Sequence, residues 1–196
     1  MSLIKNSPSW VSDEHKMFAD TTRKLFEAEM APNVEKWAEQ GIVDREFWTT
    51  VGQQGVMGGS IAEEYGGFGG GVAFDAITIY EQGRVGDSGW GYGIQSIVIH
   101  YLNAYGSEDQ KKKWLPKLIS GESVAAIAMT EPGTGSDLQN VQTYAEQDGN
   151  HYKINGSKIF ITNGHTADLV VVVAKTDRAA GAKGVSLIVL ETEGAE

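Results

Sequence analysis

The sequence predicts an α+β protein, with an all-α helical bundle over residues 1–121 followed by an incomplete antiparallel β-domain over residues 122–196. Up to about residue 120, apolar residues recur with the 3.6-residue period of helices. After Ser123 the period is two, as in strands. Two dipeptides that favour tight hairpin turns, Asp148-Gly149 and Asn155-Gly156, separate the alternating segments.

The first helix is expected to begin after Ser12, whose hydroxyl can cap it, and to end near Pro32. Val11, Phe18 and Leu25 recur every seven residues and give this helix an apolar face. Helices joined by short loops favour a bundle. Further helices are expected over residues 34–41, 44–55, 72–85, 91–105 and 107–121, the last opened by the capping box Ser107-Glu108-Asp109-Gln110.

A glycine-rich segment over residues 58–71 interrupts these helices and predicts a long bend. Such a loop could also cradle a phosphate. It lacks the lysine-serine ending of a P-loop and the preceding strand of a dinucleotide fingerprint, so a plain connector is favoured.

Three apolar runs in the second half predict strands: Val124–Met129, Leu169–Ala174 and Val185–Leu190. The second is almost wholly aliphatic, which indicates burial on both faces. Because the last strand ends close to Glu196, we expect the β-domain to be cut partway through.

Composition narrows the function classes. A formal net charge of −10 disfavours nucleic acid and anionic membranes as partners. The absence of cysteine excludes disulfides and thiolate chemistry and fits a cytoplasmic or similarly reducing compartment. The N-terminus lacks the apolar core of a signal peptide, and no apolar run is long enough to span a bilayer. His15, His100, His151 and His165 show no metal-site or triad spacing, so surface or packing roles are expected.

Two motifs carry the chemistry. The first, Met129-Thr130-Glu131-Pro132-Gly133-Thr134-Gly135-Ser136-Asp137, follows a predicted strand, and its glycines allow a ligand to approach the backbone while its hydroxyls offer hydrogen bonds. Taken alone, the motif is more typical of a tight turn with hydrophilic ends than of a ligand site. The second, Asn155-Gly156-Ser157-Lys158-Ile159-Phe160-Ile161-Thr162-Asn163-Gly164, precedes the aliphatic strand.

Together these motifs resemble the acyl-CoA dehydrogenases, as do residues 63–67 and 106–115, and residues 126–130 and 156–158 look most like the long-chain branch. The resemblance implies a helical domain, a central β-domain and a second helical domain, with FAD and the acyl-CoA thioester meeting between them. Most of the third part is absent from this sequence. The flavin contacts it implies are Ile127, Met129, Thr130, Gly135, Ser136, Phe160, Ile161 and Thr162.

A flavin ring has apolar faces and a polar edge, which suits Phe160 beside the ring and the hydroxyls of Thr130 and Thr162 at its edge. Many relatives carry tryptophan where this chain has Phe160. The resemblance also implies that Ser136 touches the thioester-bearing arm of the substrate. Glu131 is expected to anchor a loop rather than to act as the base.

The reaction that the resemblance implies removes an α-proton from an acyl-CoA while a β-hydride passes to the flavin, giving a trans-2-enoyl-CoA. The base is expected to be a glutamate beyond Glu196, so the chain alone should be inactive. Electron-transfer flavoprotein is the implied acceptor, and the full-length protein is expected to be a tetramer.

Two other functions remain open: an acyl-CoA oxidase, and a non-catalytic acyl-binding or interaction module with the same fold. A further question concerns the helix over residues 91–105, which in relatives borders the acyl chain. The residues concerned are Ile94, Gln95, Ile97, Val98 and Ile99, and core packing explains them equally well because two faces of this helix are apolar.

Overall fold

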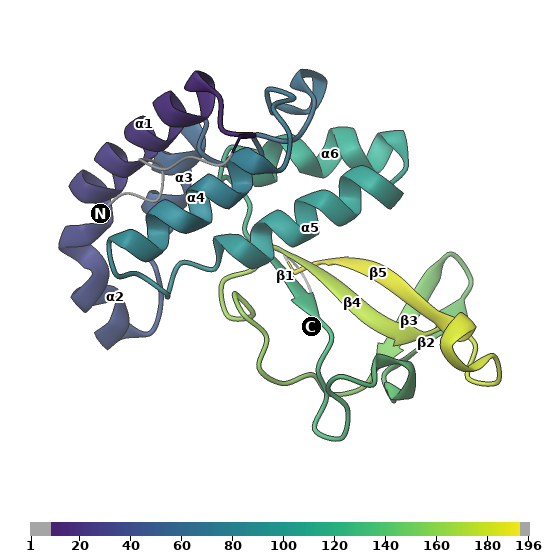
Figure 1. The fold of residues 1–196 in the computed structure, drawn as a ribbon. Helices are drawn as coiled ribbons and strands as arrows, with labels where there is room; N and C mark the ends of the chain where they lie inside the picture. The colour runs from purple at the N-terminus through teal and green to yellow at the C-terminus, as the bar shows by residue number, and fades with distance from the viewer. Residues whose placement is uncertain (1–8, 193–196) are drawn as a thin grey trace. The chain divides into compact units, whose positions relative to one another are not determined.

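The chain folds into two compact units in a computed structural model, which describes residues 9–192 (Figure 1). The first unit covers Met1–Glu122 and the second Ser123–Glu196, so the division lies one residue from the expected boundary. The first unit is helical and the second contains a sheet, which confirms the predicted α+β class.

Six α-helices lie within residues 9–122 of the first unit, and their ends follow local signals. The Ser12 side chain accepts a hydrogen bond from the His15 amide, and the Ser107 side chain accepts one from the Gln110 amide, so both predicted caps are confirmed. Gly41 ends a helix in the left-handed conformation, at φ 73°. The helices are α1 (Asp13–Glu29), α2 (Val34–Gln40), α3 (Arg45–Gln53), α4 (Ala73–Arg84), α5 (Tyr92–Tyr105) and α6 (Glu108–Ile119).

Aromatic side chains fill the core of the helical unit around Trp90. Its ring lies 5.5 Å from the ring of Phe26 and 5.4 Å from that of Phe47, centroid to centroid, both edge-on. Tyr92 stacks on it at 4.9 Å. These edge-on and stacked arrangements are the favoured ones for aromatic pairs, so the cluster joins α1, α3 and the start of α5.

The glycine-rich segment is a packed connector. A Cβ atom on Gly67 would lie 2.0 Å from the carbonyl oxygen of Ile61, so the backbone needs glycine there for a close approach. The Tyr65 hydroxyl donates to the Glu108 carboxylate at 2.6 Å and ties the segment to α6. This hydrogen bond to Glu108 raises the pKa of Tyr65 to about 12. Close backbone packing therefore explains Gly67.

The second unit holds one five-stranded sheet, which is mixed rather than antiparallel as expected. Strand β4 lies at its centre, with β1 parallel to it and β5 antiparallel to it along its whole length. Tyr144 of β2 pairs in parallel with Lys175 of β4. The strands are β1 (Ala125–Ala128), β2 (Tyr144–Asp148), β3 (His151–Asn155), β4 (Leu169–Lys175) and β5 (Val185–Glu191).

Only one of the two predicted turns joins a hairpin. Asp148-Gly149 connects β2 to β3, as expected. Asn155-Gly156 does not, because the chain leaves β3 there for an irregular segment that reaches β4. A Cβ on Gly156 would lie 2.2 Å from the Thr143 hydroxyl oxygen, so this glycine serves close packing.

Candidate cofactor site

The first motif forms a tight turn directly after β1. The Glu131 amide donates to the Thr134 carbonyl oxygen at 2.9 Å, and the Thr134 amide donates back to the Glu131 carbonyl oxygen at 3.1 Å. Pro132 and Gly133 occupy the exposed tip. The Thr134 hydroxyl donates to the Asn140 carbonyl oxygen and holds the turn against the chain that follows.

The second motif lies alongside β1 and its continuation. The Ile159 amide donates to the Thr130 carbonyl oxygen at 3.0 Å, and the Lys158 ammonium donates to the Met129 carbonyl oxygen at 2.8 Å. Further along, the Asn163 side-chain amide donates to the Ala125 carbonyl oxygen at 3.0 Å. The two motifs are thus brought together, although Lys158 and Met129 are 29 positions apart in the sequence.

Between these contacts, the backbone of the second motif adopts an unfavourable conformation. Phe160 has φ 55° and Asn163 has φ 63°, and among residues 9–192 they are the only non-glycine residues with positive φ. This region is uncommon for asparagine and a true outlier for a bulky residue. The Phe160 side chain is 89% exposed. An aromatic ring presented to solvent on a strained backbone is the kind of feature found at ligand sites.

Glu131 and Lys158 form a buried ion pair beneath the turn. Their side chains are 5% and 11% exposed, and the ammonium nitrogen lies 2.9 Å from the carboxylate oxygen Oε1. The carboxylate also accepts from the backbone amides of Gln142, at 2.6 Å, and Thr143, at 2.9 Å. Burial alone would raise the pKa of Glu131, but the donors on Thr143, Gln142 and Lys158 outweigh it and lower the pKa from 4.5 to about 2. The expected loop-anchoring role of Glu131 is confirmed.

The predicted flavin contacts differ in the exposure of their side chains and in whether they contact the second motif. Ile127 is buried in β1, and the Ile161 side chain packs against the core of the sheet, so both can reach a ligand only through their backbones. Gly135 and Ser136 lie exposed beyond the turn. In the described part of the chain, no hydrogen bond joins either of them to the second motif. The groups that do come together are those of Met129, Thr130 and residues 158–163.

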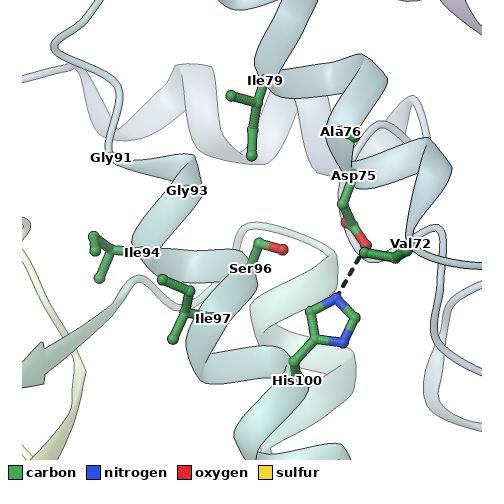
Figure 2. Close-up of a pocket in the computed structure, with 10 residues that line it drawn as sticks. All are labelled: Val72, Asp75, Ala76, Ile79, Gly91, Gly93, Ile94, Ser96, Ile97 and His100. Atoms are coloured by element: carbon green, nitrogen blue, oxygen red, sulfur yellow. Dashed lines mark hydrogen bonds and ion pairs between the residues drawn. The ribbon is translucent and has the colours of Figure 1, made fainter.

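The helical unit contains a separate pocket of about 610 Å³ between α4 and α5. Figure 2 shows Ile79 of α4 and Ile94 and Ile97 of α5 beside it. Gln95, Val98 and Ile99 are instead fully buried in the helical unit. The residues of α5 that line the pocket and those that pack in the core therefore lie on different faces of the helix.

A polar cluster borders one part of this pocket. The ring nitrogen Nε2 of His100 lies 3.2 Å from a carboxylate oxygen of Asp75, and the Tyr92 hydroxyl donates to the other oxygen at 2.5 Å. Burial and the neighbouring Asp75 raise the pKa of Tyr92 well above its usual value. Asp75 and His100 were not candidates from the sequence, because residues 25 positions apart on two helices give no periodic signal.

Within residues 9–192, no three His, Asp or Glu side chains gather in a way that would hold a metal ion. None of the helices described there is both long and apolar enough to cross a membrane.

Comparison with known proteins agrees with this fold and these motifs. Residues 12–122 match the model of the acyl-CoA dehydrogenase N-terminal domain, and residues 126–196 match that of the acyl-CoA dehydrogenase middle domain. This chain therefore belongs to the acyl-CoA dehydrogenase family.

Three relatives show how much of the family's length is present. The long-chain specific acyl-CoA dehydrogenase of Sus scrofa is 46% identical over 183 residues, which are 92% of this chain and 43% of that protein. The crystal structure of an acyl-CoA dehydrogenase from Geobacillus kaustophilus superposes with a TM-score of 0.90 at 44% identity, covering 94% of this chain and 50% of that one. A glutaryl-CoA dehydrogenase from Mycobacterium smegmatis in complex with FADH2 gives a TM-score of 0.83 at 29% identity, covering 93% and 46%. The chain thus spans about half the length of the relatives it matches.

Proposed function

We propose that this chain is the FAD-binding part of an acyl-CoA dehydrogenase that oxidises long-chain acyl-CoA thioesters to trans-2-enoyl-CoA. The observation that carries the proposal is Phe160, an exposed aromatic ring on a strained backbone directly after Ile159, whose amide donates to the Thr130 carbonyl oxygen of the first motif. When bound, FAD supplies the acceptor for the β-hydride. The pig relative's long-chain specificity supports the substrate class.

The groups near Phe160 suit a planar ring with a polar edge. Phe160 offers an apolar face, and the exposed Thr162 and half-buried Thr130 offer hydroxyls. Met129, Gly135 and Ser136, with the backbones of Ile127 and Ile161, complete the proposed flavin contacts. Ser136 is also proposed to meet the thioester-bearing arm of the substrate. The function of these groups is to bind and orient, which lowers the barrier by holding the reactants in line.

The apolar pocket between α4 and α5 is proposed to take part of the acyl chain. Ile79, Ile94 and Ile97 line it, and apolar side chains of this kind favour a hydrocarbon over water. The proposal for this helix is therefore limited to the face that carries Ile94 and Ile97.

The catalytic base is proposed to lie beyond Glu196. Glu131, the carboxylate of the first motif, is buried and already accepts hydrogen bonds from three donors, so it is poorly suited to remove a proton from the substrate. Electron-transfer flavoprotein is the proposed electron acceptor, and a homotetramer the proposed assembly. A reducing compartment is retained as a proposal from the absence of cysteine; the name of the pig relative describes that protein as mitochondrial.

Anaerobic assay of the longest form that the gene encodes tests this function. Long-chain acyl-CoA should bleach the visible flavin absorbance and yield trans-2-enoyl-CoA. The 196-residue chain supplied with FAD should not do so, because loss of a positioned base alone costs about 10² to 10⁴ in rate. Bleaching by the short chain at the rate of the long form would show that the base lies within these residues.

The same preparation distinguishes the alternatives. Rapid oxygen consumption during turnover would favour an acyl-CoA oxidase. Acyl-CoA binding by the long form without flavin uptake would favour a non-catalytic binding module.

A further inference from the structure

We propose that Glu131, Lys158 and Asn163 are positioning residues, which hold residues 159–162 in their strained conformation so that the flavin contacts are in place before the cofactor binds. The proposal rests on the proposed flavin function. It assigns a role to three side chains that are not themselves flavin contacts.

The first anchor is the buried pair of Glu131 and Lys158. Lys158 donates both to the Met129 carbonyl oxygen and to the Glu131 carboxylate, at 2.8 and 2.9 Å. Lys158 therefore holds the second motif against the first through two hydrogen bonds. The Ile159 amide adds a third contact through the Thr130 carbonyl oxygen. Phe160 follows directly, so its backbone has little freedom on this side.

The Glu131 carboxylate extends this anchor to a third segment. Its oxygens accept from the consecutive amides of Gln142 and Thr143, directly before β2. A single side chain thus joins the end of β1, the entry to β2 and the second motif. A buried ion pair is costly unless its remaining hydrogen-bonding positions are satisfied, and here they are satisfied by the backbones that must be aligned.

The second anchor lies on the other side of Phe160. The Asn163 side chain donates to the Ala125 carbonyl oxygen at 3.0 Å, at the start of β1. Asn163 itself has φ 63°, which asparagine tolerates better than most residues. Residues 159–162 are therefore held at one end against the start of β1 and at the other against the residues that directly follow it. A strained backbone persists only where its surroundings over-determine it, and the two anchors provide this restraint for Phe160.

A purely stabilising role would be served as well by apolar side chains, since replacing a buried ion pair by packed hydrophobic residues is often neutral or favourable. A positioning role predicts something different. Removal of an anchor should change how bound flavin is held, even where the sheet remains folded and flavin is saturating.

The test compares four single variants of the longest encoded form. Lys158→Met removes the charge and both donors of the first anchor. Asn163→Gly removes the second anchor but keeps a residue that accepts positive φ, so it is the variant that best preserves the fold. The matched controls are Lys153→Met and Glu146→Gln, which alter an exposed cross-strand pair on the β2–β3 hairpin.

We expect both anchor variants to bind FAD about 10- to 100-fold more weakly than the unmodified protein in titrations of the flavin-free form. At saturating FAD, their flavin fluorescence and the shape of the visible band should also differ from those of the unmodified protein. The two hairpin variants should match the unmodified protein in affinity and spectrum. Hydrogen exchange of residues 123–192 reports whether each variant keeps a folded sheet.

The outcome for Asn163→Gly decides whether the positioning role holds. If Asn163→Gly keeps a protected sheet and binds FAD with unchanged affinity and spectrum, the positioning role is overturned and the proposed function stands. If it binds weakly but gives the unmodified spectrum at saturation, the anchors act only on stability and the positioning role is again overturned. If the unmodified protein takes up no flavin, the proposed function fails and the positioning role with it. An altered spectrum in Asn163→Gly supports the proposal even where Lys158→Met does not fold.

Discussion

Two buried glutamates, one in each unit, have pKa values that are shifted in opposite directions. Glu81 of α4 is fully buried, and its only hydrogen bond among the described residues runs from Arg84 to one oxygen at 3.3 Å. Burial outweighs the attraction of Arg84 and Arg23 and raises the pKa of Glu81. Glu131 is 5% exposed, yet three donors lower its pKa to about 2.

The difference shows that burial does not decide the charge of a carboxylate; the donors around it do. Glu131 lies where three backbone segments meet, and its charge is used to align them. Glu81 lacks such a set of donors, so burial disfavours the charged form of its carboxylate.

The largest effect is expected for Glu131→Ala. This variant leaves the buried Lys158 ammonium without its carboxylate and two backbone amides without their acceptor, so the β-unit should lose about 3–5 kcal/mol. Faster hydrogen exchange of residues 123–192, with helical residues unchanged, would report the loss. A change below about 1 kcal/mol would contradict the view that this carboxylate joins the segments.

The next largest effect is expected from a fall in pH, which should change the stability contributions of the two glutamates in opposite directions. The pKa of Glu131 is lower in the folded state, so its contribution to stability is complete above about 4.5 and is lost as the pH falls towards about 2. The expected size is about 3 kcal/mol. Glu81 has the opposite sign: because its folded pKa is raised, its contribution is greatest at low pH and declines as the pH rises through the folded pKa. Hydrogen exchange of each unit, measured from pH 6 to 3, should show that the β-unit loses stability relative to the β-unit of a Glu131→Gln variant.

A smaller effect of opposite direction is expected for Glu81→Gln. The neutral amide can still accept from Arg84 and removes a charge that lacks a full set of partners. The helical unit should gain about 1 kcal/mol at pH 7, measured by urea unfolding followed by tryptophan fluorescence. Since every tryptophan lies in this unit, the signal reports it alone. Destabilisation by more than about 1 kcal/mol would mean that the charged form is properly satisfied.

The smallest effect on stability is expected for Phe160→Gly. Glycine accepts φ 55° without strain, and the exposed ring contributes little burial, so the β-unit should change by less than about 1 kcal/mol. Flavin affinity should nevertheless fall, because the apolar face is lost. Thermal unfolding and FAD titration of the same sample give both quantities. A large loss of stability with unchanged affinity would reverse the roles assigned to this ring.

The accuracy of sequence-based prediction followed how local each signal was. Ser12 and Ser107 act within three residues of their own positions, so the helix starts they predict are correct. Asp148-Gly149 is likewise a local turn. The hairpin turn predicted at Gly156 is wrong, because the role of this glycine is set by Thr143, which approaches it through the fold. The prediction of an antiparallel sheet is wrong at β1 and β4 for the same reason. Their parallel direction depends on a crossover of about 40 residues rather than on a turn.

The candidate site shows the same limit. Its flavin contacts were implied by the motifs, but the role of Lys158 and the strain at Phe160 were not. A usable signal was present: Lys158 and Glu131 are opposite charges placed next to apolar runs, and charged side chains are almost never buried unless paired. Backbone strain gives no such warning, because neither phenylalanine nor its neighbours favour positive φ.

The two motifs are proposed to form one flavin site, so the double variant Phe160→Ala/Thr162→Ala should no longer retain flavin. The matched control is Tyr152→Ala, which removes another exposed aromatic ring from the same unit. After purification of the longest encoded form and extended dialysis, we expect the double variant to lose its visible flavin absorbance while Tyr152→Ala and the unmodified protein keep theirs. A folded double variant that retains its full flavin absorbance would contradict this proposal.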